Sequence, residues 1–206
     1  MLTDTQLTEL SKKMNFKLVG CFFKDELPRK LIYNEGYIIN LDNAFDEEGN
    51  PNEGSHWTAL QVNKYPNGKI EPIFFDPYGA PPSEEIVKFV KNNTGKYLPY
   101  TKTDVQSLMN NACGYYCAAF FHYIQAWEYR CKDLYNDVAM FMSYFDDLNV
   151  SVDWKKNEYI LAHFFMDKDP LKRKAIDIIT DIQADDEYEK NNPDIVRLPT
   201  NINIMK

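Results

Sequence analysis

HWTALQVNKYPNGKIEPIFFDP, residues 56–77, contains two apolar segments on either side of a short polar stretch. The Asn67-Gly68 pair in that stretch favours the tight turn of a β-hairpin. The pattern therefore predicts two antiparallel strands, at 56–63 and 70–77, that lie next to each other at the centre of a sheet.

The rest of the chain predicts further elements around this hairpin. A capping box and two leucines on one side indicate a short amphipathic helix at 3–14. An acidic stretch rich in Gly, Asn and Pro, 42–55, indicates an exposed loop. The other predicted strands are 16–23, 37–41 and 96–101, and the other predicted helices are 83–91, 113–127, 138–145, 153–165 and 170–182. This order predicts one α+β domain, residues 1–182, whose sheet is covered by helices, followed by a polar linker and tail, 183–206.

Composition limits the classes of function. The 206 residues carry a formal net charge of −8 and have a sequence pI near 4.9, which argues against a protein that grips nucleic acid through a basic face. No apolar run approaches the ~20 residues of a membrane-spanning helix, and the first residues lack the pattern of a signal peptide. We therefore expect a reducing compartment and free thiols at the four cysteines: Cys21, Cys113, Cys117 and Cys131.

Cys113 stands at the start of an unusually apolar segment in NNACGYYCAAFF, residues 110–121. If Asn110 or Asn111 caps the helix, Cys113 lies in its first turn, where free backbone N–H groups and the helix dipole favour a thiolate. Gly114 has no side chain and would leave the approach to the sulfur open. The alternative is that Cys113 packs as a small hydrophobic residue.

A nucleophilic cysteine needs a base, and the chain has three histidines. His122 and His163 lie in apolar helical segments, where a structural role is the default interpretation. His56 begins a strand after the acidic loop, and the hairpin brings it near Asp76 at the end of the partner strand. Asp76 could orient the imidazole and stabilise its charged form, although Asp-Pro-Tyr-Gly is also a good turn sequence.

An acyl-transfer site also needs hydrogen-bond donors for an oxyanion. Gln106 lies in a polar stretch shortly before the cysteine, where its side-chain amide could act together with the Cys113 backbone N–H. The alternative is an ordinary surface glutamine. The assignment gains its weight only from the complete set of His56, Asp76, Gln106 and Cys113.

Four segments carry a family resemblance: GSHWTAL, FFDPYG, DVQ and NNACGYYCAAFFHYIQAW, in this order. They resemble the adenovirus-type cysteine endopeptidase, adenain, and its relatives, the SUMO- and ubiquitin-like-protein peptidases. The resemblance implies a papain-like arrangement, with a central mixed sheet flanked by helices and the catalytic cysteine at the N-terminus of a buried central helix. It implies that His56 is the general base, that Asp76 orients it and that Cys113 is the nucleophile, with Gln106 and the Cys113 N–H as the oxyanion hole. Trp57 matches the aromatic residue after the histidine, whereas adenain usually has glutamate as the acid.

The same resemblance implies a function. This function is cleavage of viral capsid and other structural precursor proteins during virion maturation, through thiolate attack and an acyl-enzyme intermediate, at Gly-containing sites. Trp57 and Gly114 would contact the substrate. The origin would be a virus or a virus-like mobile element. The expected locations are the virion and the cytoplasm or nucleus of the infected cell, and the expected state is a monomer.

Regulation would differ from that of adenain, which is activated by DNA and by a viral peptide tethered through a disulfide. Residues 96–104 contain no cysteine for such a tether, and the acidic net charge disfavours binding to DNA. No cofactor is expected for the chemistry, and a peptide activator would have to bind without the disulfide.

Two alternatives stay open from the sequence. The same catalytic residues could serve an isopeptidase that acts on a ubiquitin-like or SUMO-like modifier. A different class, a zinc-binding interaction protein, could use Cys113, Cys117 and His122. Their spacing on one helix, however, does not bring all three onto a common face, and no fourth ligand is near.

Overall fold

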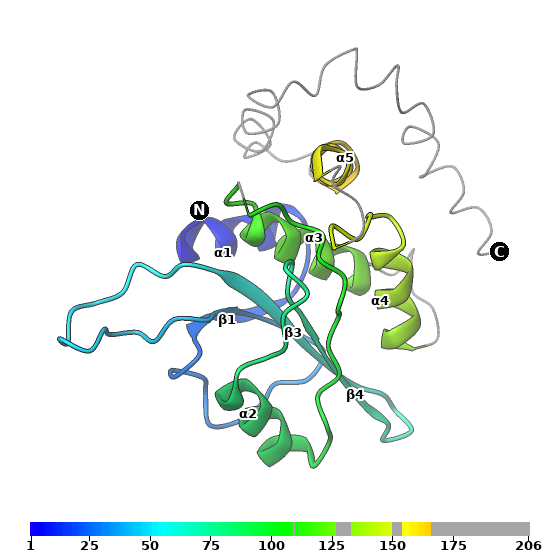
Figure 1. The fold of residues 1–206 in the computed structure, drawn as a ribbon. Helices are drawn as coiled ribbons and strands as arrows, with labels where there is room; N and C mark the ends of the chain where they lie inside the picture. Colours follow the sequence, from blue (N-terminus) through cyan, green and yellow to red (C-terminus); the bar gives the residue numbers. More distant parts are fainter. Residues whose placement is uncertain (109, 127–132, 150–153, 166–206) are drawn as a thin grey trace.

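A mixed four-stranded sheet lies at the centre of the computed structural model, which describes residues 1–108, 110–126, 133–149 and 154–165 (Figure 1). The strands follow chain order: β1 (Leu18–Phe23), β2 (Gly36–Asn40), β3 (Trp57–Lys64) and β4 (Ile70–Phe75). β1 and β2 run parallel, and the other neighbours run antiparallel. The described residues therefore have the α+β architecture that the sequence predicts.

The predicted hairpin is the β3–β4 pair. Its register places Ala59 opposite Phe75, and the Tyr65 N–H donates to the Lys69 carbonyl across the turn at 2.9 Å. The prediction of two central strands is wrong for β4, which lies at the edge of the sheet. Pro72 of β4 has no N–H to donate, and an edge strand tolerates this loss.

The predicted strand at 96–101 is reduced to a single bridge with β4. Phe74 donates to the Pro99 carbonyl at 2.9 Å and accepts the Thr101 N–H at 3.1 Å. The next pair of bonds in a parallel ladder would need the N–H groups of Pro72 and Pro99, and proline has none. This prediction is therefore wrong, because Pro72 and Pro99 prevent the ladder from extending back over residues 96–98.

Both faces of the sheet are buried. α1 (Asp4–Lys13), α3 (Cys113–Gln125) and α4 (Leu134–Met142) cover one face, and α2 (Glu84–Thr94) covers the other (Figure 1). Alternate residues of β3 point to the two sides, so that Trp57 and Ala59 join the core under α3, whereas Leu60 and Val62 join the core under α2. α3 is buried on nearly every face, which agrees with its almost continuous apolar sequence.

Helix boundaries follow local capping. α1 begins with the predicted capping box. α4 begins at Leu134, before the predicted start at 138, because the Asp133 side chain caps it. α5 (Trp154–Ile160) and the π-helical segment η2 (Leu161–Phe165) follow. The predicted helix 170–182 and the predicted tail 183–206 lie outside the described residues.

Cys21, Cys113 and Cys117 are free thiols, as the sequence predicts, and Cys131 lies outside the described residues. Among the residues that the structure describes, no helix combines the length and the apolar character that crossing a membrane requires.

Candidate active site

His56 and Asp76 lie side by side at the open end of the β3–β4 hairpin. His56 directly precedes β3, and Asp76 directly follows β4. The imidazole Nε2–H donates to Asp76 Oδ1 at 2.8 Å, with the histidine side chain 12% exposed and the carboxylate buried. Because an ionised carboxylate only accepts, this bond leaves Nδ1 as the ring nitrogen that can exchange a proton elsewhere.

Asp76 also forms the turn that follows β4. Its Oδ1 accepts the Tyr78 N–H and its carbonyl accepts the Gly79 N–H, each at 2.8 Å. Gly79 has φ of 69°, and a Cβ there would lie 2.5 Å from the Lys102 carbonyl oxygen, so the turn requires glycine. The two interpretations of Asp76 from the sequence, turn residue and histidine partner, are therefore both correct as descriptions of its contacts.

Cys113 is the first residue of α3 and is buried. Its side chain interacts with the imidazole of His56 and raises the pKa of that histidine, so the hairpin and the central helix meet at these two side chains. The predicted cap at Asn110 or Asn111 is wrong, because the N-cap residue is Ala112. Asn110 acts just before the helix instead, where its Oδ1 accepts the Ala112 N–H at 3.1 Å and orients the chain that enters α3.

The charges of the site favour a protonated His56. Burial alone lowers the pKa of His56, but its hydrogen bonds to Asp76 and Cys113, and the charges of these groups, raise that pKa to about 9. The two other described thiols have a different environment. Burial raises the pKa of Cys21 to about 12 and raises the pKa of Cys117 well above its ordinary value. An imidazolium therefore faces Cys113, whereas Cys21 and Cys117 stay protonated at neutral pH.

Gln106 lies next to these residues, on the segment that leads to α3. Its buried Nε2 donates to Tyr78 Oη and to the Asn110 carbonyl, both at 3.1 Å. Its backbone N–H donates to the Pro77 carbonyl at 3.1 Å, which fastens the segment to the turn after β4. Both amide hydrogens have acceptors, so one of them must change its acceptor before Gln106 can donate to an oxyanion.

Tyr78 is a residue of this site that the sequence analysis did not assign. Its ring stacks on His56, with centroids 4.5 Å apart and planes inclined by 23°. Burial, followed by the negative charges around it, raises its pKa, so the hydroxyl stays neutral. The hairpin register could have identified Tyr78 as a neighbour of His56. Extending the register outward by three residues from Ala59 and Phe75 places His56 opposite Tyr78.

Trp57 and Gly114, the two predicted substrate contacts, both pack against residues near the N-terminus. The Trp57 Nε1–H donates to the Leu2 carbonyl at 2.8 Å. A Cβ on Gly114 would lie 3.1 Å from Leu7 and 3.3 Å from Leu2. The missing side chain thus makes room for these leucines, which differs from the expected open approach to the sulfur. Substrate contact by Trp57 or Gly114 stays a prediction.

The zinc alternative finds no support in the geometry of α3. Cys117 Sγ donates to the Trp57 carbonyl at 3.4 Å, and His122 Nδ1 lies 2.7 Å from the Met14 carbonyl oxygen. These residues therefore have separate partners. No group of three or more His, Cys, Asp or Glu side chains among the described residues is arranged to hold a metal ion.

Two comparisons with known proteins give no match: one against protein-family models and one against curated proteins. The function of this chain must therefore be inferred from the geometry and chemistry of its own residues.

Proposed function

We propose that this protein is a cysteine endopeptidase in which Cys113 attacks the carbonyl carbon of a peptide bond. One observation carries the proposal: His56 hydrogen-bonds Asp76 and interacts with Cys113, the first residue of a buried helix. A carboxylate, an imidazole and a thiol in contact in this order can activate a nucleophile for acyl transfer. Packing of Cys113 as a hydrophobic residue would not explain why a buried His–Asp pair contacts its side chain.

His56 transfers the proton in both halves of the proposed reaction. With Nδ1 protonated, His56 faces the Cys113 thiolate, which attacks the scissile carbonyl, so a C–S bond forms and the carbonyl π electrons move to oxygen. When the tetrahedral intermediate collapses, the C–N bond breaks and the leaving amine takes the proton from Nδ1. His56 then takes a proton from water, the resulting hydroxide attacks the thioester, and collapse breaks the C–S bond to restore the thiolate and the imidazolium. Asp76 binds Nε2 throughout and stabilises the imidazolium.

The proposed oxyanion hole has two donors. The Cys113 backbone N–H belongs to the first turn of α3, where N–H groups lack an acceptor within the helix. Gln106 would be the second donor, once its amide exchanges either Tyr78 Oη or the Asn110 carbonyl for the oxyanion. A nucleophile at the start of a buried helix, facing a base at the end of a sheet, would be the papain-like arrangement that the sequence resemblance implies. The same resemblance suggests capsid and other structural precursor proteins, cleaved at Gly-containing sites, as the substrates.

Alkylation tests the activated pair without a known substrate. The purified protein is treated with iodoacetamide at pH 6, and mass spectrometry locates the label. We expect fast labelling of Cys113 and little labelling of Cys21 or Cys117, because burial raises the pKa of both of these thiols. His56→Ala should slow the reaction at Cys113. A Cys113 that reacts no faster than Cys21, or that reacts equally fast in the His56 variant, would contradict the proposal.

Hydrolysis tests the reaction class. Internally quenched peptides with a central Gly-Gly pair are incubated with the wild type, and conjugates of ubiquitin-like modifiers serve as parallel substrates. We expect the wild type to cleave the peptides, Cys113→Ala to be inactive and Gln106→Ala to lose a factor of about 10²–10³. Cleavage of the conjugates alone would assign the protein to the isopeptidases. Activity that survives in Cys113→Ala would rule out this nucleophile.

A further inference from the structure

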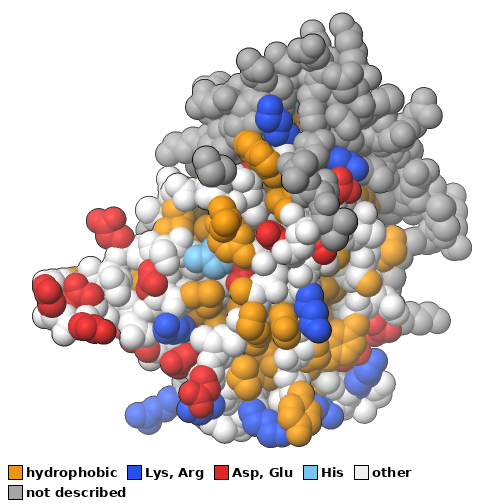
Figure 2. All heavy atoms as spheres, in the orientation of Figure 1, with side chains coloured by type: hydrophobic (Ala, Val, Ile, Leu, Met, Phe, Trp, Pro, Cys, Tyr) orange, Lys and Arg blue, Asp and Glu red, His pale blue; other side chains and the backbone are white. Residues whose placement is uncertain are grey.

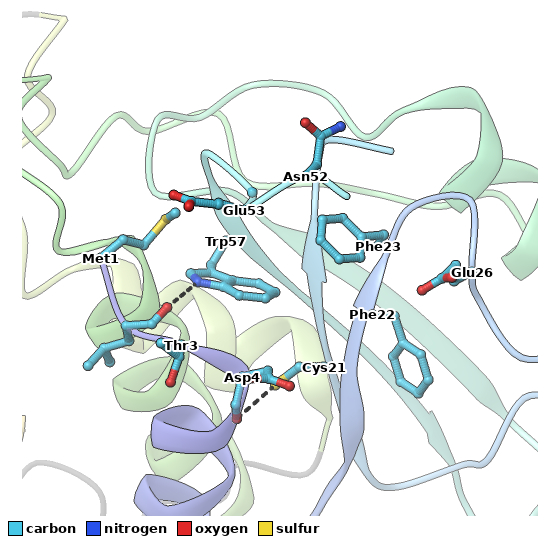
Figure 3. A pocket seen from close by; sticks show the side chains of 12 residues that line it. Met1, Thr3, Asp4, Cys21, Phe22, Phe23, Glu26, Asn52, Glu53 and Trp57 are labelled. Atoms are coloured by element: carbon cyan, nitrogen blue, oxygen red, sulfur yellow. Dashed lines mark hydrogen bonds between the residues drawn. The ribbon is translucent and has the colours of Figure 1, made fainter. Parts of the chain in front are cut away.

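A cavity of about 640 Å³ lies beside Trp57, the residue that follows His56 (Figure 3). Residues that lead into α1, the strand β1 and the loop before β3 together form its wall. Leu2 connects the cavity to the proposed site, since its carbonyl accepts the Trp57 indole N–H and its side chain packs at Gly114, next to Cys113. The cavity therefore shares its wall with the residues that flank the proposed base and nucleophile.

The cavity combines an aromatic surface with an acidic rim. Trp57, Phe22 and Phe23 supply the aromatic surface, and Figure 3 shows Trp57 between the side chains of the rim. The start of α1, the segment after β1 and the loop before β3 each add one exposed carboxylate to the lining: Asp4, Glu26 and Glu53. Three distant parts of the sequence thus bring like charges to one cavity.

These carboxylates have no cationic partner among the residues that the structure describes. The ion pairs of that part of the chain involve other acidic residues. The loop before β3 adds further acidic side chains: Asp42, Asp46, Glu47 and Glu48. Acidic side chains gather on the projecting side of the molecule (red, on the left in Figure 2). Like charges that are brought together without an ion-pair partner favour binding of a positively charged group.

We propose that this cavity binds a Lys or Arg side chain of the peptide substrate, within a few residues of the bond that Cys113 attacks. The inference rests on the proposed peptidase function. The methylene stem of a basic side chain can lie along the rings of Trp57 and Phe23, and its charged head can reach the carboxylates at the rim. An acidic side chain would be repelled, and an uncharged side chain of similar shape would gain only the apolar contact.

Kinetics on a small set of peptides test this specificity. Internally quenched decapeptides with a central Gly-Gly pair carry lysine, norleucine or glutamate at one of the three positions on either side of that pair. Norleucine matches the lysine stem and lacks the charge. At one or more positions we expect kcat/KM for the lysine peptide to exceed that for the norleucine peptide by about tenfold, the sum of a few exposed ion pairs. The preference should decrease as salt is added.

A pair of double variants shows whether the cavity causes the preference. Glu26→Gln with Glu53→Gln neutralises two carboxylates of the rim, and we expect the ratio of lysine to norleucine to fall to about twofold or less. Glu47→Gln with Glu48→Gln removes the same charge from the same acidic face without touching the cavity, and the ratio should be kept. Equal ratios in the two double variants, or no preference for lysine in the wild type, would overturn the inference.

Binding to the inactive variant separates this inference from the proposed function. Nα-acetyl-arginine amide and Nα-acetyl-norleucine amide are titrated into Cys113→Ala, and the Trp57 indole and Gly54 amide resonances are followed by NMR. Larger shifts with the arginine probe, lost in Glu26→Gln/Glu53→Gln, support the cavity even if no peptide is cleaved, and the peptidase proposal would then fail alone. If the peptides are cleaved without a preference for lysine and the arginine probe causes no such shifts, the cavity proposal fails and the peptidase proposal stands.

Discussion

Each end of the β3–β4 hairpin carries a buried carboxylate, and the partners of the two carboxylates differ. At the turn end, Glu71 accepts the Tyr65 hydroxyl at 2.7 Å and the Leu134 N–H at 2.8 Å, and it forms an ion pair with Lys69. Burial alone would raise the pKa of Glu71, but these three donors lower it. Glu71 is therefore held as an anion that fixes the start of α4 to the hairpin.

At the open end, Asp76 has no Lys or Arg within ion-pair distance among the described residues, and its charged partner is His56. A lysine stays protonated over the whole pH range in which most proteins are folded, whereas a histidine can lose its proton. One hairpin thus holds two carboxylate–cation pairs of different kinds. The permanent cation makes a structural link, and the titratable cation makes a site that can exchange protons.

The largest expected effect is on kcat/KM, and it should appear at the open end of the hairpin and not at the turn end. Asp76→Asn keeps the side-chain size but removes the charge that stabilises the imidazolium, so kcat/KM should fall by about 10³–10⁴-fold. The pKa of His56, about 9 in the wild type, should fall, and the alkaline limb of the kcat/KM–pH profile should move to lower pH. Glu71→Gln makes the same change at the turn end and should leave the profile in place. An unmoved profile in Asp76→Asn would show that Asp76 does not act through His56.

His56 and Glu71 should lose their contributions to the free energy of unfolding at opposite ends of the pH scale. The folded pKa of His56, about 9, lies above its ordinary value of 6.5, so its contribution is complete below pH 6.5 and is lost as pH rises to 9. The lowered pKa of Glu71 gives a contribution that is present above its ordinary value of 4.5 and is lost as pH falls. Urea unfolding at pH 6 and pH 9.5 should differ by up to ~3 kcal/mol. His56→Gln should remove most of this difference, and an unchanged difference would assign it to other groups.

The structural role of Glu71 at the turn end is tested by the free energy of unfolding of a Glu71 variant. Glu71→Gln leaves the Lys69 ammonium and the Leu134 N–H without their anionic acceptor, and should lower the free energy of unfolding by about 1–3 kcal/mol. Urea unfolding at pH 7 measures the loss. Glu84→Gln, which breaks an exposed pair with Lys88 on α2, should change it far less. If Glu71→Gln costs no more than Glu84→Gln, the link to α4 is not a source of stability.

The smallest effect concerns the tyrosine of the open end. Tyr78→Phe keeps the ring on His56 and removes the hydroxyl that accepts a Gln106 amide hydrogen. We expect kcat/KM to fall by about three- to tenfold through poorer orientation of Gln106, while the alkylation rate of Cys113 stays the same. The same substitution made in Gln106→Ala should have no further effect. A full tenfold loss in that background would mean that Tyr78 acts through His56 instead.

The sequence predicts the features of this molecule that depend on local chemistry. The Asn67-Gly68 turn sets the hairpin and, with it, the approach of His56 to Asp76, since both residues belong to one continuous segment. The apolar run after Cys113 predicts a buried helix for the same reason. The meeting of this helix with the hairpin was expected from the chemistry that a nucleophile requires, together with the family resemblance, and not from any local pattern.

Other features depend on contacts between distant segments, which no local pattern records. The edge position of β4 depends on which strand pairs beside it, although Pro72 was a hint. The asparagine cap failed because Asn110 binds the Ala112 N–H from a position just outside the helix. The acidic cavity is formed by three segments whose charges look, in the sequence, like ordinary solvated residues. Only packing brings them together.

The hairpin also bears on when, during folding, the proposed catalytic residues come together. His56 and Asp76 are joined across 20 residues of chain, whereas Cys113 reaches them only when α3 packs on the sheet from much further along the sequence. Local contacts form early in folding and distant ones form late. A newly made chain can thus hold His56 and Asp76 together before Cys113 stands beside them, so the peptidase proposal predicts no cleavage of neighbouring proteins until the core has closed.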